Sequence, residues 1–131
     1  MKPNMQEKYL FEYAVIRMVP RVEREEFCNV GIILFSKEQK FLQAMHTVNE
    51  AKVKALDEKA DIPEILAYLH AFEKICQGAK EGGPIAQLDM PSRFRWLTAQ
   101  RSTILQTSRV HPGFCKNPQE ALVRLHQQLV L

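Results

Sequence analysis

The stretch of sequence that decides the fold is residues 9–48, which read YLFEYAVIRMVPRVEREEFCNVGIILFSKEQKFLQAMHTV. Residues 9–19 are rich in aromatic and β-branched types and are followed by Pro20, which is typical of a strand. Residues 27–35 are apolar on both faces and predict a central strand, and residues 41–48 predict a third strand. Because the connectors between them are short, we expect an antiparallel meander.

Helix signals replace strand signals after this stretch. Asn49 is expected to cap a short helix. The tetrapeptide Asp-Ile-Pro-Glu at residues 61–64 is a capping box with proline in the first turn, and it opens an amphipathic helix that should end near Gly78. Residues 117–120, Asn-Pro-Gln-Glu, repeat this signature and open a final helix.

The segment between these two helices has weaker signals. Residues 80–84 have the composition of a loop, and Ser92 is expected to cap a short helix. Residues 102–108 predict a fourth strand, and residues 110–113 predict a turn or loop. The apolar faces of all these elements predict a core that contains Val15, Val30, Ile32, Leu34, Leu66, Leu69, Leu122 and Leu125.

The order of the elements, with strands first and helices later, favours an α+β fold over an α/β fold. We expect one α+β domain over residues 1–131. It should contain a three-stranded antiparallel meander and a later fourth strand, packed against two main helices and short helices. The length of 131 residues, 46% of them hydrophobic and 25% charged, suits one such domain.

Bulk features favour a cytoplasmic protein without a membrane partner. No apolar run approaches the roughly 18 residues of a membrane span. Glu7, Lys8 and Glu12 stand where a secretion signal needs its apolar stretch. The three cysteines are an odd number with no C-x-x-C pair, so we expect free thiols rather than disulfides.

The net charge of +3 conceals an asymmetry along the chain. Residues 1–90 carry 12 Lys and Arg against 14 Asp and Glu, whereas residues 91–131 carry 6 against 1. Residues 91–117 contain five cations and no acid: Arg93, Arg95, Arg101, Arg109 and Lys116. Arginine and hydroxyl donors together suit an anion such as phosphate, and Trp96 among them could stack on a nucleic-acid base. The alternative is structural: the arginines pair with acids elsewhere in the chain, and Trp96 packs in the core.

Signals for catalysis or metal binding are weak. The sequence has no G-x-S-x-G, H-E-x-x-H, P-loop or G-x-G-x-x-G motif, so we predict no catalytic residue and no cofactor. No second ligand pair supports a zinc site at His111 and Cys115, so we predict no metal site. Asn29 and Gly31 interrupt an apolar strand, which favours a β-bulge or close packing over contact with a ligand.

Several blocks of sequence resemble one bacterial family. They include YAVIR at residues 13–17, NVGIILF at residues 29–35, and R-x-R-W-L-T-A-x-R-S-T-I-x-Q-T-S-x-V-H-P-G at residues 93–113. The chain is similar, over essentially its whole length, to the family known as domain of unknown function 3037, although Gln100 stands where that family often has proline. The resemblance implies a cytosolic, single-domain protein without an established activity. It also implies a partner or accessory role beside a HipA-like kinase, because genes of the two families are often neighbours.

The charge pattern and the family motif together predict a ligand-binding set: Arg17, Glu26, Asn29, Arg93, Arg95, Trp96, Arg101, Thr107 and His111. From these residues we expect an accessory binding module that recognises a protein or phosphate-bearing partner through the arginine-rich face of residues 93–111. Two alternatives are an enzyme acting on a phosphate-containing substrate, with Glu26 as base, and a nucleic-acid binder that uses Trp96.

Three kinds of surface would distinguish these functions. A deep polar pocket that joins Glu26, Asn29 and Arg101 would favour the enzyme. An open basic surface around Trp96 would favour nucleic acid. A flat apolar patch rimmed by arginines would favour a protein partner.

Overall fold

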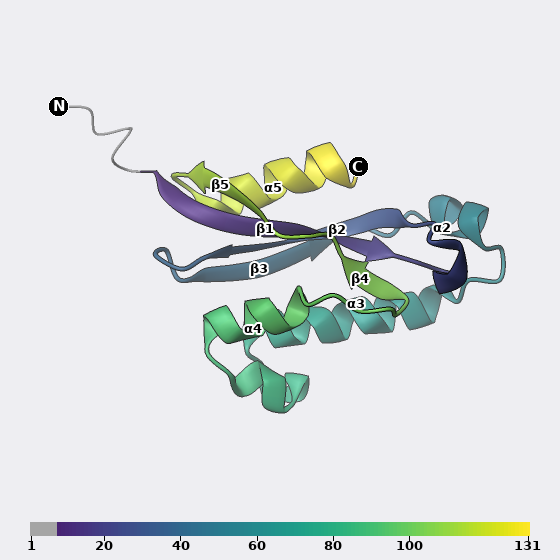
Figure 1. Cartoon of the computed structure of the whole chain (residues 1–131), viewed down its shortest axis with the longest axis horizontal. Helices are drawn as coiled ribbons and strands as arrows, with labels where there is room; N and C mark the ends of the chain where they lie inside the picture. Colours follow the sequence, from purple (N-terminus) through teal and green to yellow (C-terminus); the bar gives the residue numbers. More distant parts are fainter. Residues whose placement is uncertain (1–7) are drawn as a thin grey trace.

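A five-stranded antiparallel sheet forms the centre of the computed structural model, which describes residues 8–131 (Figure 1). The strands are β1 (Tyr9–Met18), β2 (Cys28–Ser36), β3 (Phe41–His46), β4 (Leu105–Thr107) and β5 (His111–Cys115). The order is β3-β2-β1-β4, and β5 also pairs with β1. The expected α+β class and the antiparallel meander of β1, β2 and β3 are confirmed. The expectations for residues 1–7, including Glu7, lie outside the described residues.

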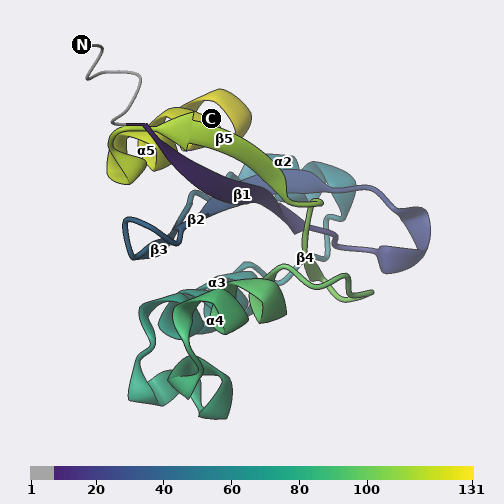
Figure 2. The same cartoon turned by 60° about the vertical axis from the view of Figure 1, so that its left-hand side comes forward.

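Helices cover both faces of this sheet. Figure 1 and Figure 2 show α5 on one face and the pair α3 and α4 on the other. The helices are α2 (Glu50–Leu56), α3 (Ile62–Gln77), α4 (Met90–Leu97) and α5 (Pro118–Leu129). Short 3-10 turns lie at Val22–Arg24, Lys80–Gly82 and Pro84–Gln87. The chain therefore has a helix–sheet–helix layering in which α3 and α4 share one side.

The alternation of side chains along β1 divides the core into two clusters. Ala14, Ile16 and Met18 pack on the side of α3 and α4. Phe11 and Val15 pack on the side of α5. The predicted core residues that are buried are Val15, Val30, Ile32, Leu34, Leu69, Leu122 and Leu125.

A β-bulge interrupts β2 where the sequence breaks its apolar run. Ile16 pairs with Gly31 and Arg17 pairs with Asn29, so Val30 is the extra residue between them. The bulge that the sequence favoured is thus confirmed. A Cβ atom at Gly31 would lie 2.7 Å from the carbonyl oxygen of Met45, so glycine here allows β3 to approach closely.

Three helices begin where their capping signals predict, and α3 also ends as predicted. Side-chain oxygens of Asn49, Asp61 and Asn117 accept hydrogen bonds from backbone N–H groups three residues later. The α3 helix ends at Gln77 and is capped by Gly78, whose φ of 70° is in the left-handed region that favours glycine.

Three expectations for the segment after α3 differ from the structure. Ser92 does not cap α4; the cap is Asp89, whose carboxylate accepts the Ser92 N–H at 2.8 Å, with Pro91 in the first turn. Residues 110–113 are not a turn, because residues 111–115 form β5 and pair with β1. Proline is tolerated there because β5 pairs with β1 alone among the described strands, and Gly113 leaves room for the ring of Phe11. The fourth strand, expected over residues 102–108, is limited to Leu105–Thr107.

Leu66 is the predicted core residue that the structure places at the surface. Its side chain is 43% exposed, whereas the neighbouring Ile65 is buried. Successive residues of a helix are rotated by about 100°, so Leu66 turns away from the sheet when Ile65 faces it.

Candidate functional site

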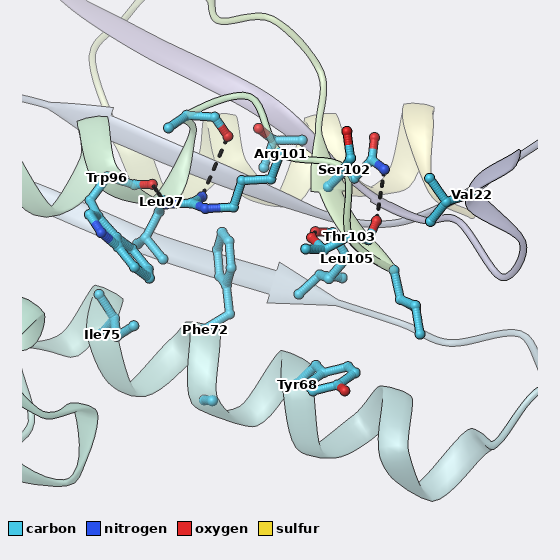
Figure 3. Close-up of a pocket in the computed structure, with 15 residues that line it drawn as sticks. Val22, Tyr68, Phe72, Ile75, Trp96, Leu97, Arg101, Ser102, Thr103 and Leu105 are labelled. Carbon is cyan, nitrogen blue, oxygen red and sulfur yellow. Dashed lines mark hydrogen bonds between the residues drawn. The ribbon is translucent and has the colours of Figure 1, made fainter. Parts of the chain in front are cut away.

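An apolar groove lies between α3 and the segment of residues 96–107 (Figure 3). We call it the α3 groove, and its volume is about 550 Å³. One wall is a row on α3 with the spacing i, i+3, i+4 and i+7: Tyr68, Ala71, Phe72 and Ile75. The opposite wall includes Trp96, Leu97, Arg101, Leu105 and Thr107. Arg101 is the one charged side chain among the described residues that line it.

The packing of α4 places Trp96 on this wall. Phe94 and Leu97 are buried in the core, and the ring of Phe94 lies 5.0 Å from that of Phe35. Trp96 lies between them in the sequence, and it remains 40% exposed. Tyr68 on the other wall is 43% exposed. The groove thus presents two large aromatic side chains to solvent, and Trp96 is not core packing.

Arg101 is held in place over the indole of Trp96. Its Cζ atom lies 4.2 Å from the centroid of the indole ring. Its Nη2 donates to the carbonyl oxygen of Trp96 at 2.6 Å, and its Nη1 donates to that of Ala99 at 3.4 Å (Figure 3). The remaining N–H groups of this guanidinium have no partner among the described residues, so they are available to an acceptor.

Three main-chain carbonyls of the same wall already accept hydrogen bonds. The hydroxyl of Thr103 donates to the carbonyl of Leu105 at 2.8 Å, and the side-chain amide of Gln106 donates to that of Thr103 at 2.7 Å. The carbonyl of Ile104 accepts the N–H of Val19 at 2.7 Å. These bonds stabilise the wall.

Two arginines of the predicted set have structural contacts away from the groove. Arg93 donates to the carbonyls of Leu88 at 2.8 Å and Cys76 at 3.4 Å, and so joins the end of α3 to α4. Arg95 forms a two-pronged ion pair with the carboxylate of Glu12 on β1, at 3.0 and 3.2 Å.

His111 lies on β5, where its ring packs at 5.4 Å from that of Tyr13. The groove therefore brings together Trp96, Arg101 and Thr107 of the predicted set, but not Arg93, Arg95 or His111.

The candidates from the first half of the chain also lie apart from the groove. The guanidinium of Arg17 stacks at 4.2 Å over the ring of Phe27. Glu26 pairs with Arg24 at 2.6 Å, and the hydrogen bond from that guanidinium lowers the pKa of the exposed carboxyl. Asn29 donates to the carbonyl of Leu129 at 2.9 Å and so ties β2 to α5. Neither Glu26 nor Asn29 lines the groove beside Arg101.

A second cavity, of about 500 Å³, lies on the other side of α3 against β3. It is lined by Lys40, Gln43, Glu73, Gln77 and Arg93 among others. The Glu73 carboxylate lies 2.5 Å from Nδ1 of His46. Burial raises the pKa of the Cys76 thiol on this wall to about 12, so the thiol is not a reactive nucleophile.

Three further observations concern chemistry elsewhere in the chain. Cys28, Cys76 and Cys115 are free thiols, as expected. Within residues 8–131, no group of three or more His, Cys, Asp or Glu side chains is placed to hold a metal ion. A membrane span would need a longer and more apolar helix than any in the described part of the chain.

Sequence reasoning missed the α3 wall of the groove. The residues that would have revealed it are Tyr68, Ala71 and Ile75, which extend the apolar arc of α3 beyond its buried row. An apolar arc wider than one packed face indicates a second contact surface.

A family model described as "Protein of unknown function (DUF3037)" matches residues 13–130 of the chain. No curated protein and no solved structure matches it.

Proposed function

This chain belongs to the DUF3037 family, whose function is unknown, and we propose that it is a binding module for a protein partner. An apolar segment of that partner docks in the α3 groove. The observation that carries the proposal is the exposure of Trp96 and Tyr68 on facing walls of an apolar groove, in which Arg101 is the one charged residue of the described lining. Tryptophan, tyrosine and arginine are the residues that contribute most to protein interfaces.

The positions of the other arginines favour a protein over a phosphate-bearing ligand or nucleic acid. A phosphate is bound most strongly where several donors converge on one point. Arg93 and Arg95 are engaged with backbone carbonyls and with Glu12. Arg101 is the one cationic residue among the described residues that line the groove. The mostly apolar lining offers a phosphate only the hydroxyls of Ser102, Thr103 and Thr107 beside it.

The resemblance gives one named candidate for the partner. A HipA-like kinase family protein, encoded beside members of this family, is the first protein to test for binding at the groove. A cytoplasmic site of action belongs to the same proposal.

The experiment that tests the proposal is a peptide selection. A random-peptide library is panned against the wild-type protein, and selected peptides are titrated against Tyr68→Ala, Trp96→Ala and the control Phe114→Ala. Phe114 is a strongly exposed aromatic residue on β5, outside the groove. We expect at least roughly tenfold weaker binding in the two groove variants, as for interface hot spots, and no change in the control.

Selected peptides that bind all variants equally, or a library that yields no binder, would overturn the proposal. Circular dichroism of each variant verifies that the fold is intact.

A further inference from the structure

Several backbone carbonyls of the groove wall are already occupied by side-chain donors, which disfavours pairing with an extended peptide. A strand that adds to a sheet needs free N–H and C=O groups on the edge it joins. Near the edge strand β4, the carbonyls of Thr103 and Leu105 already accept side-chain donors. Those of Trp96 and Ala99 accept from Arg101. A helix satisfies its own backbone hydrogen bonds, so it fits such a wall better than a strand does.

The α3 wall has the dimensions of a helix-packing surface. Tyr68 and Ile75 are seven residues apart, which is about 10 Å along the axis and two turns of helix. Ala71 stands between them, and its small side chain allows a second helix to approach closely. An apolar stripe spaced i, i+3, i+4 and i+7 on a partner helix would match this row.

The positive charge of Arg101 indicates which polar group the occupant of the groove carries. Arg101 is held by two carbonyls and by the indole, so little side-chain freedom is lost when it binds a ligand. Its unused N–H groups suit the two oxygens of a carboxylate. No acidic side chain among the described residues lines the groove, and Glu64 on α3 accepts the hydroxyl of Tyr68 at 2.9 Å.

We infer that the occupant of the α3 groove is an amphipathic helix of the partner that carries a side-chain carboxylate beside its apolar stripe, and that Arg101 binds this carboxylate. The inference rests on the proposed function of the groove and adds the chemistry of the segment. The helix buries its apolar stripe against Tyr68, Phe72 and Trp96, and the carboxylate fixes its register.

The test uses synthetic alanine-based helical peptides that lack tryptophan and carry one stripe of Leu and Phe. A single Glu is moved along the flank of the stripe, and matched peptides carry Gln or Lys instead. Trp96 is the single tryptophan of the chain, so its fluorescence reports occupation of the groove. A peptide of the same composition with a central proline, which breaks the helix, is the conformational control.

We expect the best Glu peptide to bind wild type at least roughly fivefold more tightly than its Gln and Lys counterparts, or about 1 kcal/mol. This preference should shrink with added salt and vanish in Arg101→Gln. It should remain in Arg109→Gln, which removes one charge from the same acid-free segment outside the groove. The proline peptide should bind most weakly.

The outcomes separate this inference from the proposed function. If peptides bind in the groove without a preference for Glu, the inferred contact between Arg101 and a carboxylate is wrong. The same follows if the preference for Glu remains in Arg101→Gln. If the proline peptide binds as tightly as the helical peptide or more tightly, the inference that the occupant is a helix is wrong. In both cases the groove remains a docking site. Failure of every peptide, while library-selected peptides still lose affinity in Trp96→Ala, overturns the inference alone.

Discussion

The guanidinium of Arg101 lies over the indole of Trp96, with 4.2 Å between Cζ and the ring centroid, and it donates a 2.6 Å hydrogen bond to the carbonyl of the same residue. One side chain therefore both closes the turn that follows α4 and covers a face of the tryptophan. This pair orders the exposed wall of the α3 groove, and a rigid wall loses less conformational entropy when a ligand binds.

Replacing Arg101 with alanine should loosen the wall without unfolding the protein. The change removes the hydrogen bonds to Trp96 and Ala99 and a cation–π contact that is worth roughly 0.5–1 kcal/mol at a partly exposed site. The amides of residues 98–104 should exchange faster, while those of α5 should not change. Hydrogen exchange followed by mass spectrometry measures this, and unchanged protection of residues 98–104 would contradict it.

Leu69 and Leu66 form a matched pair on α3, with exposures of 1% and 43%. Leu69→Ala should lower the free energy of unfolding by about 2–5 kcal/mol, because it opens a cavity in the core. Leu66→Ala should change it by no more than about 0.5 kcal/mol. Chemical denaturation measures both, and similar losses for the two variants would mean that α3 docks in another rotation.

The cap of α4 gives a prediction about Asp89 and Ser92. Asp89→Ala leaves the Ser92 N–H without its acceptor and should lower the thermal midpoint. Ser92→Ala removes only the hydroxyl and should lower it less. Thermal unfolding followed by circular dichroism measures the two midpoints. A larger loss for Ser92→Ala than for Asp89→Ala would indicate that Ser92, not Asp89, caps α4.

His126 on α5 makes stability depend on pH. Burial lowers the pKa of His126, with a smaller contribution from His46. The unfolded chain then binds the proton more readily, so this contribution is present above the ordinary histidine pKa and is lost as the pH falls below it. His126→Gln does not titrate and has an amide that can bond Thr47, which His126 Nε2 contacts at 2.9 Å.

Thermal midpoints measured from about pH 7 to about pH 5 should therefore fall more for wild type than for His126→Gln. The pair of His46 and Glu73 is present in both proteins, so the comparison isolates His126 together with its charge coupling to His46. If the thermal midpoints of wild type and His126→Gln fall equally with pH, His126 does not contribute to the pH dependence of stability.

Local sequence signals predicted most helices and strands. The features that they missed depend on pairing between segments that are far apart in the sequence. The caps at Asp61 and Asn117 were readable because the donor and acceptor are three residues apart. The turn expected at residues 110–113 gave way to β5, because pairing with β1, about 100 residues earlier, outweighed the preference of proline and glycine for turns.

The same limit applies to the candidate site. The sequence singled out Trp96 and Arg101, and both line the groove. It could not show that Arg95 is paired with Glu12, 83 residues away, because the charge pattern carries no information about which acid is close in space. The contribution of α3, centred on Ala71, depends on how that helix is rotated against the sheet.

The most direct test of the central claim, that the α3 groove docks a segment of a protein partner, is an NMR titration of isotope-labelled protein with a library-selected peptide. The account predicts that the largest amide shift changes fall on residues 68–75 of α3 and on residues 96–107, and that they disappear in Trp96→Ala. Shift changes concentrated on β5 and α5, with residues 96–107 unaffected, would contradict it.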